Sequence, residues 1–273
     1  MEQPMTKRIG VLFFSPTNTT KKICDAIASG MGSDDPVVLD MTHPGKRAEI
    51  IANANTVLNE VDHLIVGAPV YCGKLPLQTI ECLGALKGYG KKSTAVAVYG
   101  NRDYGIALYN MVEMLSQNGF NVMAAGLFIG QHSYSDVVPV AMGRPDESDI
   151  EKAQKFGTQI LNVSRPLSIK DIPTQWDKHS KSKKYTALKP TYRRKICVKC
   201  GRCAAVCPTG IISPETGKHL NRHVKKICIG CMACVNNCKS GARISKANPI
   251  VGIIMKSVLG QASRVRKEPF IIT

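Results

Sequence analysis

Five short runs of apolar residues divide the first 165 residues of the chain. They are rich in Val, Ile, Ala and Phe and alternate little with polar residues, which is typical of strands buried on both faces of a sheet. The runs occupy residues 9–14, 36–40, 63–68, 94–99 and 121–128. We therefore expect five buried strands.

Between these runs, apolar residues recur at helical spacing. Residues 20–31 place Ile23, Ile27 and Ala28 on one face, and further helices are expected at residues 106–118 and 147–163. Strands that alternate with helices predict an α/β fold with a doubly wound, five-stranded parallel sheet. Ligands of such sheets bind beyond the carboxyl ends of the strands.

The periodic pattern ends near residue 165, and the rest of the chain divides into three parts. Residues 166–195 hold nine Lys or Arg and three prolines, so we interpret them as a basic linker or a loosely packed strap. Residues 196–247 are expected to form a small α+β domain that contains a cysteine repeat. Residues 248–273 form a mixed tail whose role the sequence does not indicate. The first domain is predicted to span residues 1–165.

Eight of the eleven cysteines form two quartets with the spacing C-x2-C-x2-C-x3-C, and the second quartet lies 31 positions after the first. This is the ligand spacing of two [4Fe-4S] clusters, in which the fourth Cys of each run ligates the other cluster. One cluster is therefore assigned Cys197, Cys200, Cys203 and Cys238. The other is assigned Cys228, Cys231, Cys234 and Cys207.

Two other uses of these cysteines are disfavoured. Structural zinc usually takes two separated C-x2-C pairs. Disulfides belong to oxidising compartments, whereas this chain has no secretory signal and leaves Cys24, Cys72 and Cys82 outside the repeat. We expect these three to be small core residues of a cytoplasmic protein. No apolar stretch approaches the roughly 20 residues of a membrane span.

The net charge of +17 is confined to the C-terminal part of the chain. Residues 1–165 carry 15 Lys or Arg against 16 Asp or Glu, whereas residues 166–273 carry 22 against 4. Two clusters with their thiolates offset only about four of these positive charges. The excess favours a redox partner protein with an acidic docking surface, and no recognition motif supports specific nucleic-acid binding.

Three loops at the carboxyl ends of the predicted strands contain candidate ligand-binding residues. Ser15, Thr17, Asn18, Thr19 and Thr20 form a hydroxyl-rich loop before the first helix, which suits a phosphate; alternatively, the loop only caps the helix. The other two loops carry Gly and Tyr residues suited to a planar ligand. They contain Pro69, Val70, Tyr71 and Gly73, and then Gly100, Asn101, Arg102 and Tyr104.

With these motifs, residues 6–247 resemble the fused flavodoxin/ferredoxin proteins of anaerobic bacteria and archaea. The first loop resembles the flavodoxin T/S-x-T-G-N-T pattern, with Asn18 in place of Gly and Thr19 in place of Asn. A Pro commonly follows the fourth Cys of each run; Pro208 keeps it, and Lys239 replaces it in the second. The resemblance implies a flavodoxin-like domain that binds FMN, followed by a ferredoxin-like 2[4Fe-4S] domain.

The resemblance also implies roles for the loop residues. The first loop would hold the FMN phosphate, and the other two would line the isoalloxazine ring, with Tyr71 and Tyr104 as candidates for stacking. Arg102 would stabilise a reduced, anionic flavin, or instead pair with Asp103. His132, Ser133 and Tyr134 follow the fifth strand and point to the same rim, where His132 is a catalytic group or a loop residue satisfied by the backbone.

A flavin and two clusters together predict a soluble electron-transfer protein, because a flavin exchanges two electrons and each cluster passes one. Two alternatives remain open. One is a flavin-dependent reductase fed through the clusters, and the other is a ferredoxin joined to an FMN-free flavodoxin scaffold. The chain has no G-x-G-x-x-G fingerprint, which disfavours a built-in dinucleotide site.

Overall fold

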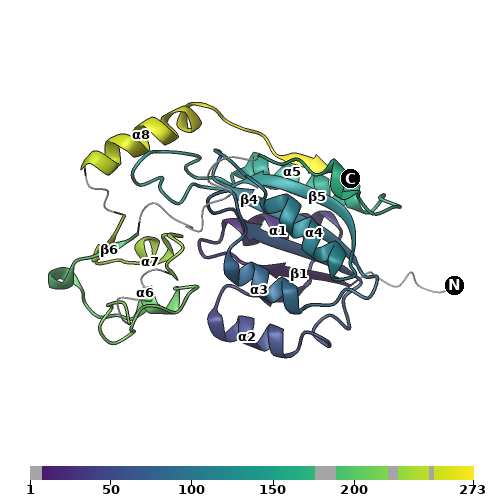
Figure 1. Cartoon of the computed structure of the whole chain (residues 1–273), viewed down its shortest axis with the longest axis horizontal. Coiled ribbons are helices and arrows are strands. Elements are labelled where there is room, and N and C mark those ends of the chain that lie inside the picture. Colours follow the sequence, from purple (N-terminus) through teal and green to yellow (C-terminus); the bar gives the residue numbers. More distant parts are fainter. Residues whose placement is uncertain (1–7, 176–188, 221–226, 246–248) are drawn as a thin grey trace.

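The computed structural model describes residues 8–175, 189–220, 227–245 and 249–273. In this part of the chain, a sheet domain lies beside a smaller cysteine-rich module, and the last helix leads from the module back to the sheet (Figure 1). No helix of the described residues is both long and apolar enough to cross a membrane.

The sheet domain contains five parallel strands in the order β2-β1-β3-β4-β5. This is the order of flavodoxin-like doubly wound folds, with the switch point between β1 and β3. The predicted five strands are confirmed, with small changes at their ends. Their bounds are β1 Ile9–Phe13, β2 Val37–Asp40, β3 His63–Pro69, β4 Lys92–Tyr99 and β5 Asn121–Ile129.

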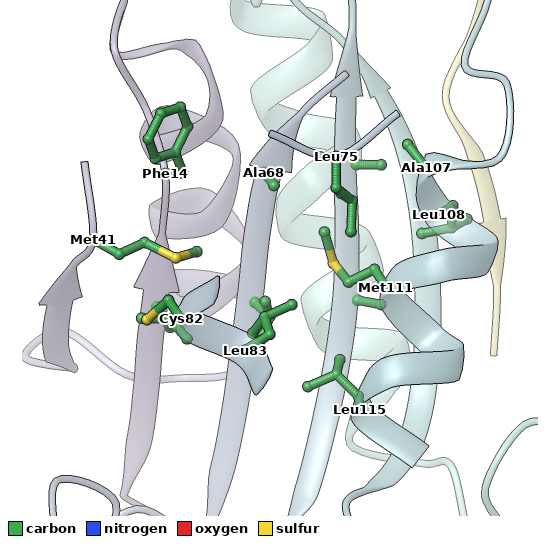
Figure 2. Packing of buried hydrophobic residues seen from close by; sticks show 14 of the residues in the cluster. Phe14, Met41, Ala68, Leu75, Cys82, Leu83, Ala107, Leu108, Met111 and Leu115 are labelled. Carbon is green, nitrogen blue, oxygen red and sulfur yellow. The ribbon is translucent and has the colours of Figure 1, made fainter. Parts of the chain in front are cut away.

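Helices cover both faces of the sheet. α1 (Thr19–Gly30) and α5 (Glu147–Ile160) cover one face. The other face carries α2 (Pro44–Ala52), α3 (Leu77–Ala85) and α4 (Ala107–Gln117). Successive side chains of a strand point to opposite faces, so Val11 joins one apolar core and Leu12 the other. Figure 2 shows Leu83 of α3 and Met111 and Leu115 of α4 packed over the sheet.

Two glycines allow α1 and α5 to pack with their backbones in contact. A Cβ on Gly157 would lie 2.2 Å from the Ile27 carbonyl oxygen, and one on Gly30 would lie 2.0 Å from the Gln154 carbonyl oxygen. Neither backbone atom can move aside cheaply. This close packing fixes α1, whose N-terminus follows the hydroxyl-rich loop.

The cysteine-rich module contains a two-stranded antiparallel sheet and short helical turns. Its elements are β6 (Thr191–Tyr192), the 3-10 turn η2 (Arg194–Ile196), α6 (Arg202–Ala205), α7 (Ala233–Asn236) and β7 (Arg243–Ile244). Ile229 and Ala233 are buried in the same apolar core as Tyr71 and Leu75 of the sheet domain. At a second contact, Arg47 Nη1 donates to the Pro208 carbonyl oxygen at 3.5 Å. The module is therefore docked on the sheet domain.

Part of the predicted linker also packs on the sheet domain. The Leu167 N–H donates to the Val122 carbonyl oxygen at 2.8 Å, and Ile172, which follows the 3-10 turn η1 (Ile169–Asp171), is buried. The Gln175 N–H donates to the Gly105 carbonyl oxygen at 2.8 Å. Residues 176–188 of the predicted linker lie outside the described residues.

The C-terminal tail, to which the sequence assigned no role, returns to the sheet. It forms α8 (Pro249–Arg264) and β8 (Phe270–Ile272), and β8 pairs antiparallel with β5 as a sixth strand. Met255 and Leu259 of α8 pack against Val138, Val140 and Met232. The chain thus leaves the sheet after β5, forms the cysteine-rich module and rejoins the same sheet edge.

The Asn101 side chain attaches this returning segment to the sheet domain. Its Nδ2 donates to the carbonyl oxygens of Ala262 at 2.8 Å and Val265 at 2.6 Å, and its Oδ1 accepts from the Lys267 N–H at 3.0 Å. Asn101 is itself 2% exposed. All three bonds lie near the end of α8, so they fix where the helix stops.

Charged pairs reinforce the same attachment. Arg144 and Asp149 form an ion pair whose side chains are 5% and 1% exposed. Arg266 of the tail pairs with Asp146 at 2.7 Å, and this hydrogen bond holds the pKa of the Asp146 carboxyl well below its usual range. Asp146 also accepts from the Asp149 N–H and caps α5.

We expect the buried pair to matter far more than the exposed one. Arg144→Met removes the close partner of the buried Asp149 carboxylate, whose remaining ion pair is the longer contact with Arg266 at 3.6 Å, and should lower the free energy of unfolding by about 3–5 kcal/mol. Arg266→Met removes a half-exposed partner and should cost about 1 kcal/mol or less. Urea unfolding of both anaerobically purified variants, followed by far-UV circular dichroism, measures the difference. Equal losses in the two variants would contradict this ranking.

Candidate functional site

A cavity of about 350 Å³ lies at the carboxyl ends of β3, β4 and β5. This is the end of a doubly wound sheet at which ligands bind, and the volume is in the usual range for ligand pockets. Many of the predicted flavin residues line it. They are Thr17, Thr19, Pro69, Val70, Tyr71, Gly73, Gly100 and Arg102.

The hydroxyl-rich loop forms a left-handed turn although Asn18 replaces the Gly of the flavodoxin pattern. Asn18 stands where the flavodoxin pattern has Gly, and it adopts left-handed backbone with φ 67°. Asn tolerates this conformation better than most residues. The Ser15 Oγ accepts from the Lys21 N–H at 3.0 Å, and the Asn18 carbonyl oxygen accepts from the Lys22 N–H at 3.2 Å. The loop therefore leads directly into α1.

Several donors of this loop are left for a ligand. Within the described residues, the backbone N–H groups of Thr17, Thr19 and Thr20 donate no hydrogen bond to a protein atom. The Thr20 Oγ1 is buried and has no partner in that part of the chain. A buried hydroxyl without a partner costs free energy. These donors at a helix N-terminus fit a phosphate group.

The structure places the other predicted flavin residues outside the lining of the cavity. Ser15 and Asn18 form the turn of the loop, and Thr20 is buried in the first turn of α1. Asn101 is turned to the C-terminal tail, which uses its whole amide group. The Tyr104 ring packs edge-on against Tyr99, with ring centroids 5.7 Å apart. Tyr71 is thus the predicted stacking residue that reaches the cavity.

The loop after β5 completes the rim, as its position in the sequence indicated. His132, Ser133 and Tyr134 line the cavity. Burial, together with the nearby Arg102 charge, lowers the pKa of His132 to about 4, so the ring is neutral at pH 7. Its Nδ1 accepts from the Tyr134 N–H at 3.1 Å, which leaves the ring proton on Nε2. Of the two roles considered for His132, this geometry fits a loop residue that is hydrogen-bonded by the backbone.

Arg102 pairs with Asp103, one of the two roles considered for it, and also lies at the cavity. It lines the cavity, and its Nε lies 3.2 Å from Asp103 Oδ2. The pair is partly exposed, so it contributes little to stability. A cation remains beside the predicted position of the flavin ring.

Two parts of the wall were not predicted from the sequence. Ile254, Met255, Val258 and Leu259 of α8 lie along it, as does Gly230 from the second cysteine motif. Gly252 and Lys256 interrupt the apolar pattern of α8, so this helix was not predicted. The C-terminal helix and the cysteine-rich module both contribute to the cavity.

Tyr71 connects the cavity to the second cysteine motif. It is 9% exposed, lines the cavity and shares an apolar core with Ile229 and Cys231. Burial raises its pKa well above the usual range, so the ring stays neutral. One side chain thus contacts both the ligand cavity and the cysteine-rich module.

The eight repeat cysteines surround two small cavities, four to each. An inner cavity is lined by Cys207, Cys228, Cys231 and Cys234. An outer cavity is lined by Cys197, Cys200, Cys203 and Cys238. This is the grouping expected from crossed ligation, because the fourth Cys of each run lies with the first three of the other. In the described part of the chain, no three metal-binding side chains converge on the position of a single ion.

The two cysteine motifs fold in the same way. Lys199 and Gly201 of the first motif, and Gly230 and Met232 of the second, occupy matching positions and all have positive φ. The helices α6 and α7 also lie 31 positions apart. Left-handed backbone on either side of the second Cys of each motif, Cys200 or Cys231, bends the loop around its cavity. Four thiols around one cavity fit a cubane cluster.

The inner and outer cavities differ in exposure. Cys231 and Cys234 are buried, whereas Cys200 is exposed. Burial raises the pKa of the Cys231 thiol well above its usual range and that of Cys234 to about 12. Ligated iron would offset the cost of forming these buried thiolates. In the outer group, the Lys199 N–H donates to Cys197 Sγ at 3.4 Å and the Arg243 N–H donates to Cys238 Sγ at 3.3 Å.

The three cysteines outside the repeat do not all behave as predicted. Cys24 and Cys82 are buried core residues, and burial raises the pKa of Cys82 to about 11. The prediction was wrong for Cys72, which is exposed and lines the large cavity. The apolar residues next to it suggested burial, but its loop turns outward with a positive φ of 52°.

Residues 196–243 match the family model of the 4Fe-4S dicluster domain. Among solved structures, a flavodoxin from the domain Archaea is 22% identical, with 56% of this chain and 95% of that chain covered and a TM-score of 0.40. Oxidised flavodoxin 2 from Bacillus cereus is 17% identical, with 56% and 97% covered and a TM-score of 0.42. A comparison with curated proteins found no match.

The strand order and the matched domain define the class of protein. The chain joins a flavodoxin-like α/β domain to a 4Fe-4S dicluster domain. The matched domain supports an iron–sulfur redox role.

The phosphate loop can be tested with two of its threonines, the half-buried Thr17 and the buried Thr20. Thr17→Val and Thr20→Val each remove a hydroxyl from the loop and should weaken FMN retention about tenfold or more, because a hydrogen bond to a charged group contributes about 1.5–3 kcal/mol. Iron content should not change. Thr79→Val is the matched control, since Thr79 is fully buried and its hydroxyl also lacks a partner among the described residues. Unchanged flavin binding in both loop variants would contradict the assignment.

The crossed ligation can be tested by iron content in double variants. Cys203→Ala with Cys238→Ala affects the outer cavity alone and should leave about four iron atoms per chain. Cys203→Ala with Cys207→Ala affects both cavities and should leave almost none. Iron and acid-labile sulfide analysis of anaerobically purified protein decides, with Cys82→Ala as the control. The reverse ranking of the two double variants would mean that each run ligates its own cluster.

Proposed function

We propose that the chain is an electron-transfer protein that relays electrons between FMN, two [4Fe-4S] clusters and a redox partner. The main support is Gly230, which belongs to the second cysteine motif and also lines the cavity at the carboxyl ends of the strands. The residue after it, Cys231, lines the inner cysteine cavity. Two adjacent residues of one loop thus line the predicted flavin site and the predicted inner cluster site, so these sites lie next to each other.

The residues of the large cavity have separate roles in this proposal. The loop of residues 15–20 binds the phosphate, Tyr71 packs against the ring, and Arg102 favours its anionic reduced form. Bound FMN supplies the exchange between two-electron and one-electron carriers. Because His132 is neutral and satisfied by the backbone, we assign it no proton transfer.

The two cysteine cavities define an order for the relay. The inner one adjoins the flavin cavity through Gly230 and Tyr71, and the outer one includes the exposed Cys200. Arg243 lines both, so the two lie next to each other. Electrons would therefore pass between the large cavity and the protein surface through both sites in series.

The surface around the outer cavity fits an acidic partner. Ile196 and Val198 are 44% and 69% exposed beside the first cysteine motif. Exposed cations flank them, namely Arg193, Arg194, Lys195 and Lys199. Apolar side chains within a positive rim favour docking of a negatively charged redox protein, and long-range attraction speeds its approach.

The arrangement gives less support to the two alternatives. A reductase needs space for a substrate over the flavin ring, but Ile254, Met255, Val258 and Leu259 of α8 occupy part of the cavity wall. An FMN-free scaffold rests on the altered loop at Asn18 and Thr19. That loop retains the left-handed turn and unused donors, which favours a bound phosphate.

Cofactor content and electron transfer test the proposal together. Anaerobically purified protein should contain about one FMN, eight iron and eight sulfide per chain. Photoreduced flavin should then reduce an acidic ferredoxin, with a rate that falls as salt rises. Cys234→Ala at the inner site and Cys203→Ala at the outer site should each slow this transfer at least tenfold while flavin photoreduction continues. Undiminished transfer in either variant would show that the two sites do not act in series.

A further inference from the structure

Arg243 occupies a buried position between the two cysteine cavities. It is 2% exposed and lines both the inner and the outer cavity. The internal repeat gives it a counterpart, because Ile212 lies 31 positions earlier, at the same place in the first motif. Ile212 is 5% exposed and belongs to an apolar cluster with Cys207 and Cys234. The second half of the repeat thus has a cation where the first half has an apolar side chain.

The protein satisfies only part of this guanidinium. Arg243 Nη2 donates to the Gly217 carbonyl oxygen, and the guanidinium carbon lies 5.0 Å from the centre of the Tyr192 ring. Nε and Nη1 are buried without a hydrogen-bond partner in the described part of the chain. No carboxylate of those residues forms a salt bridge with Arg243.

A buried cation without an anion is unfavourable, so a countercharge is needed. Arg243 shares each cavity with four cysteines, namely Cys207, Cys228, Cys231 and Cys234 in the inner one and Cys197, Cys200, Cys203 and Cys238 in the outer one. Thiolate-ligated [4Fe-4S] clusters carry about two negative charges each when oxidised and about three when reduced. Because Ile212 is accommodated at the matching position, the fold of the repeat does not itself require a charge there. The positive charge of Arg243 is therefore best explained by the anionic clusters that the two cavities would hold.

We propose that Arg243 sets the reduction potentials of both clusters as their shared countercharge. The proposal rests on the cluster binding proposed above. A fixed positive charge between two sites that become more negative on reduction favours the reduced form of each. It also screens the repulsion between an electron on one cluster and a second electron on the other, so it promotes the passage of electrons between them. Its contacts with Tyr192 and Gly217 position the guanidinium for this role.

Three variants separate charge from packing. Arg243→Ile installs the residue that the first motif carries at this place. Arg243→Lys keeps the positive charge with fewer donors. Arg194→Gln is the control, since it removes an exposed cation from the same module. Each full-length protein is purified anaerobically, analysed for iron and sulfide, and titrated with dithionite while electron paramagnetic resonance reports the reduced clusters.

In Arg243→Ile, we expect the midpoint potentials of both clusters to move to more negative values. The shift should correspond to at least a tenfold change in each one-electron equilibrium, which is about 59 mV. Arg243→Lys should lie close to the unmodified protein, and Arg194→Gln should shift less than Arg243→Ile because water and salt screen an exposed charge. A role limited to packing would leave the potentials of cluster-containing variants unchanged.

Three results would overturn the proposal. They are full cluster content in Arg243→Ile with unchanged potentials, a shift of one cluster alone, and an equal shift in Arg243→Lys and Arg243→Ile. If Arg243→Ile loses its iron, Arg243→Lys decides: retained iron supports the need for the charge, and loss in both variants indicates a packing role instead. Absence of iron from the unmodified protein would be a failure of the proposed function, and it is recognised before any variant is compared.

Discussion

The antiparallel pairing of β8 with β5 is the constraint on which the arrangement of the other parts depends. It adds a sixth strand to a parallel sheet. In the sequence, the cysteine-rich module lies between β5 and β8, which are neighbours in that sheet. The Asn101 amide and the Arg266–Asp146 pair hold the segment that leads into β8. α8 lines the cavity at the carboxyl ends of the strands, and the chain continues from it into β8 (Figure 1).

A second constraint is the apolar contact between the module and the loop after β3. Ile229 and Ala233 share a core with Tyr71 and Leu75, so the second cysteine motif is packed as an extension of the sheet domain's interior. The first motif contributes the partly buried Val206 to the edge of that core and keeps Cys200 exposed. Two loops with matching backbone conformations thereby acquire different surroundings: the second is largely buried, and the first is partly exposed to solvent. Exposure and hydrogen bonding to sulfur are among the factors that set cluster potentials.

The sequence indicated the sheet domain and the cysteine grouping better than it indicated their connection. Buried parallel strands are continuous apolar runs, so Ile9–Phe13 and β5 were recognisable. The crossed ligation typical of paired C-x2-C-x2-C-x3-C runs predicted which cysteines share a cavity. The tail was not recognisable, because α8 is interrupted by Gly252 and Lys256 and β8 has only three residues. Asn101 was assigned to the flavin from its loop, whereas its amide binds backbone groups of residues remote in sequence. Aligning the two halves of the repeat would have revealed the exchange of Ile212 for Arg243.

Attachment at both ends also determines how such a protein can move charge. A carrier domain on a single tether delivers electrons by swinging between donor and acceptor, so its rate depends on tether length and on solvent viscosity. Here, the cysteine-rich module is joined to the sheet through β8 at one end and through the packed segment around Ile172 at the other. The proposed cluster sites would then keep one spacing from the cavity proposed for FMN. The rate of electron transfer within the protein would therefore depend on the fixed distances between the cofactors. Diffusion would limit only the encounter with the partner protein.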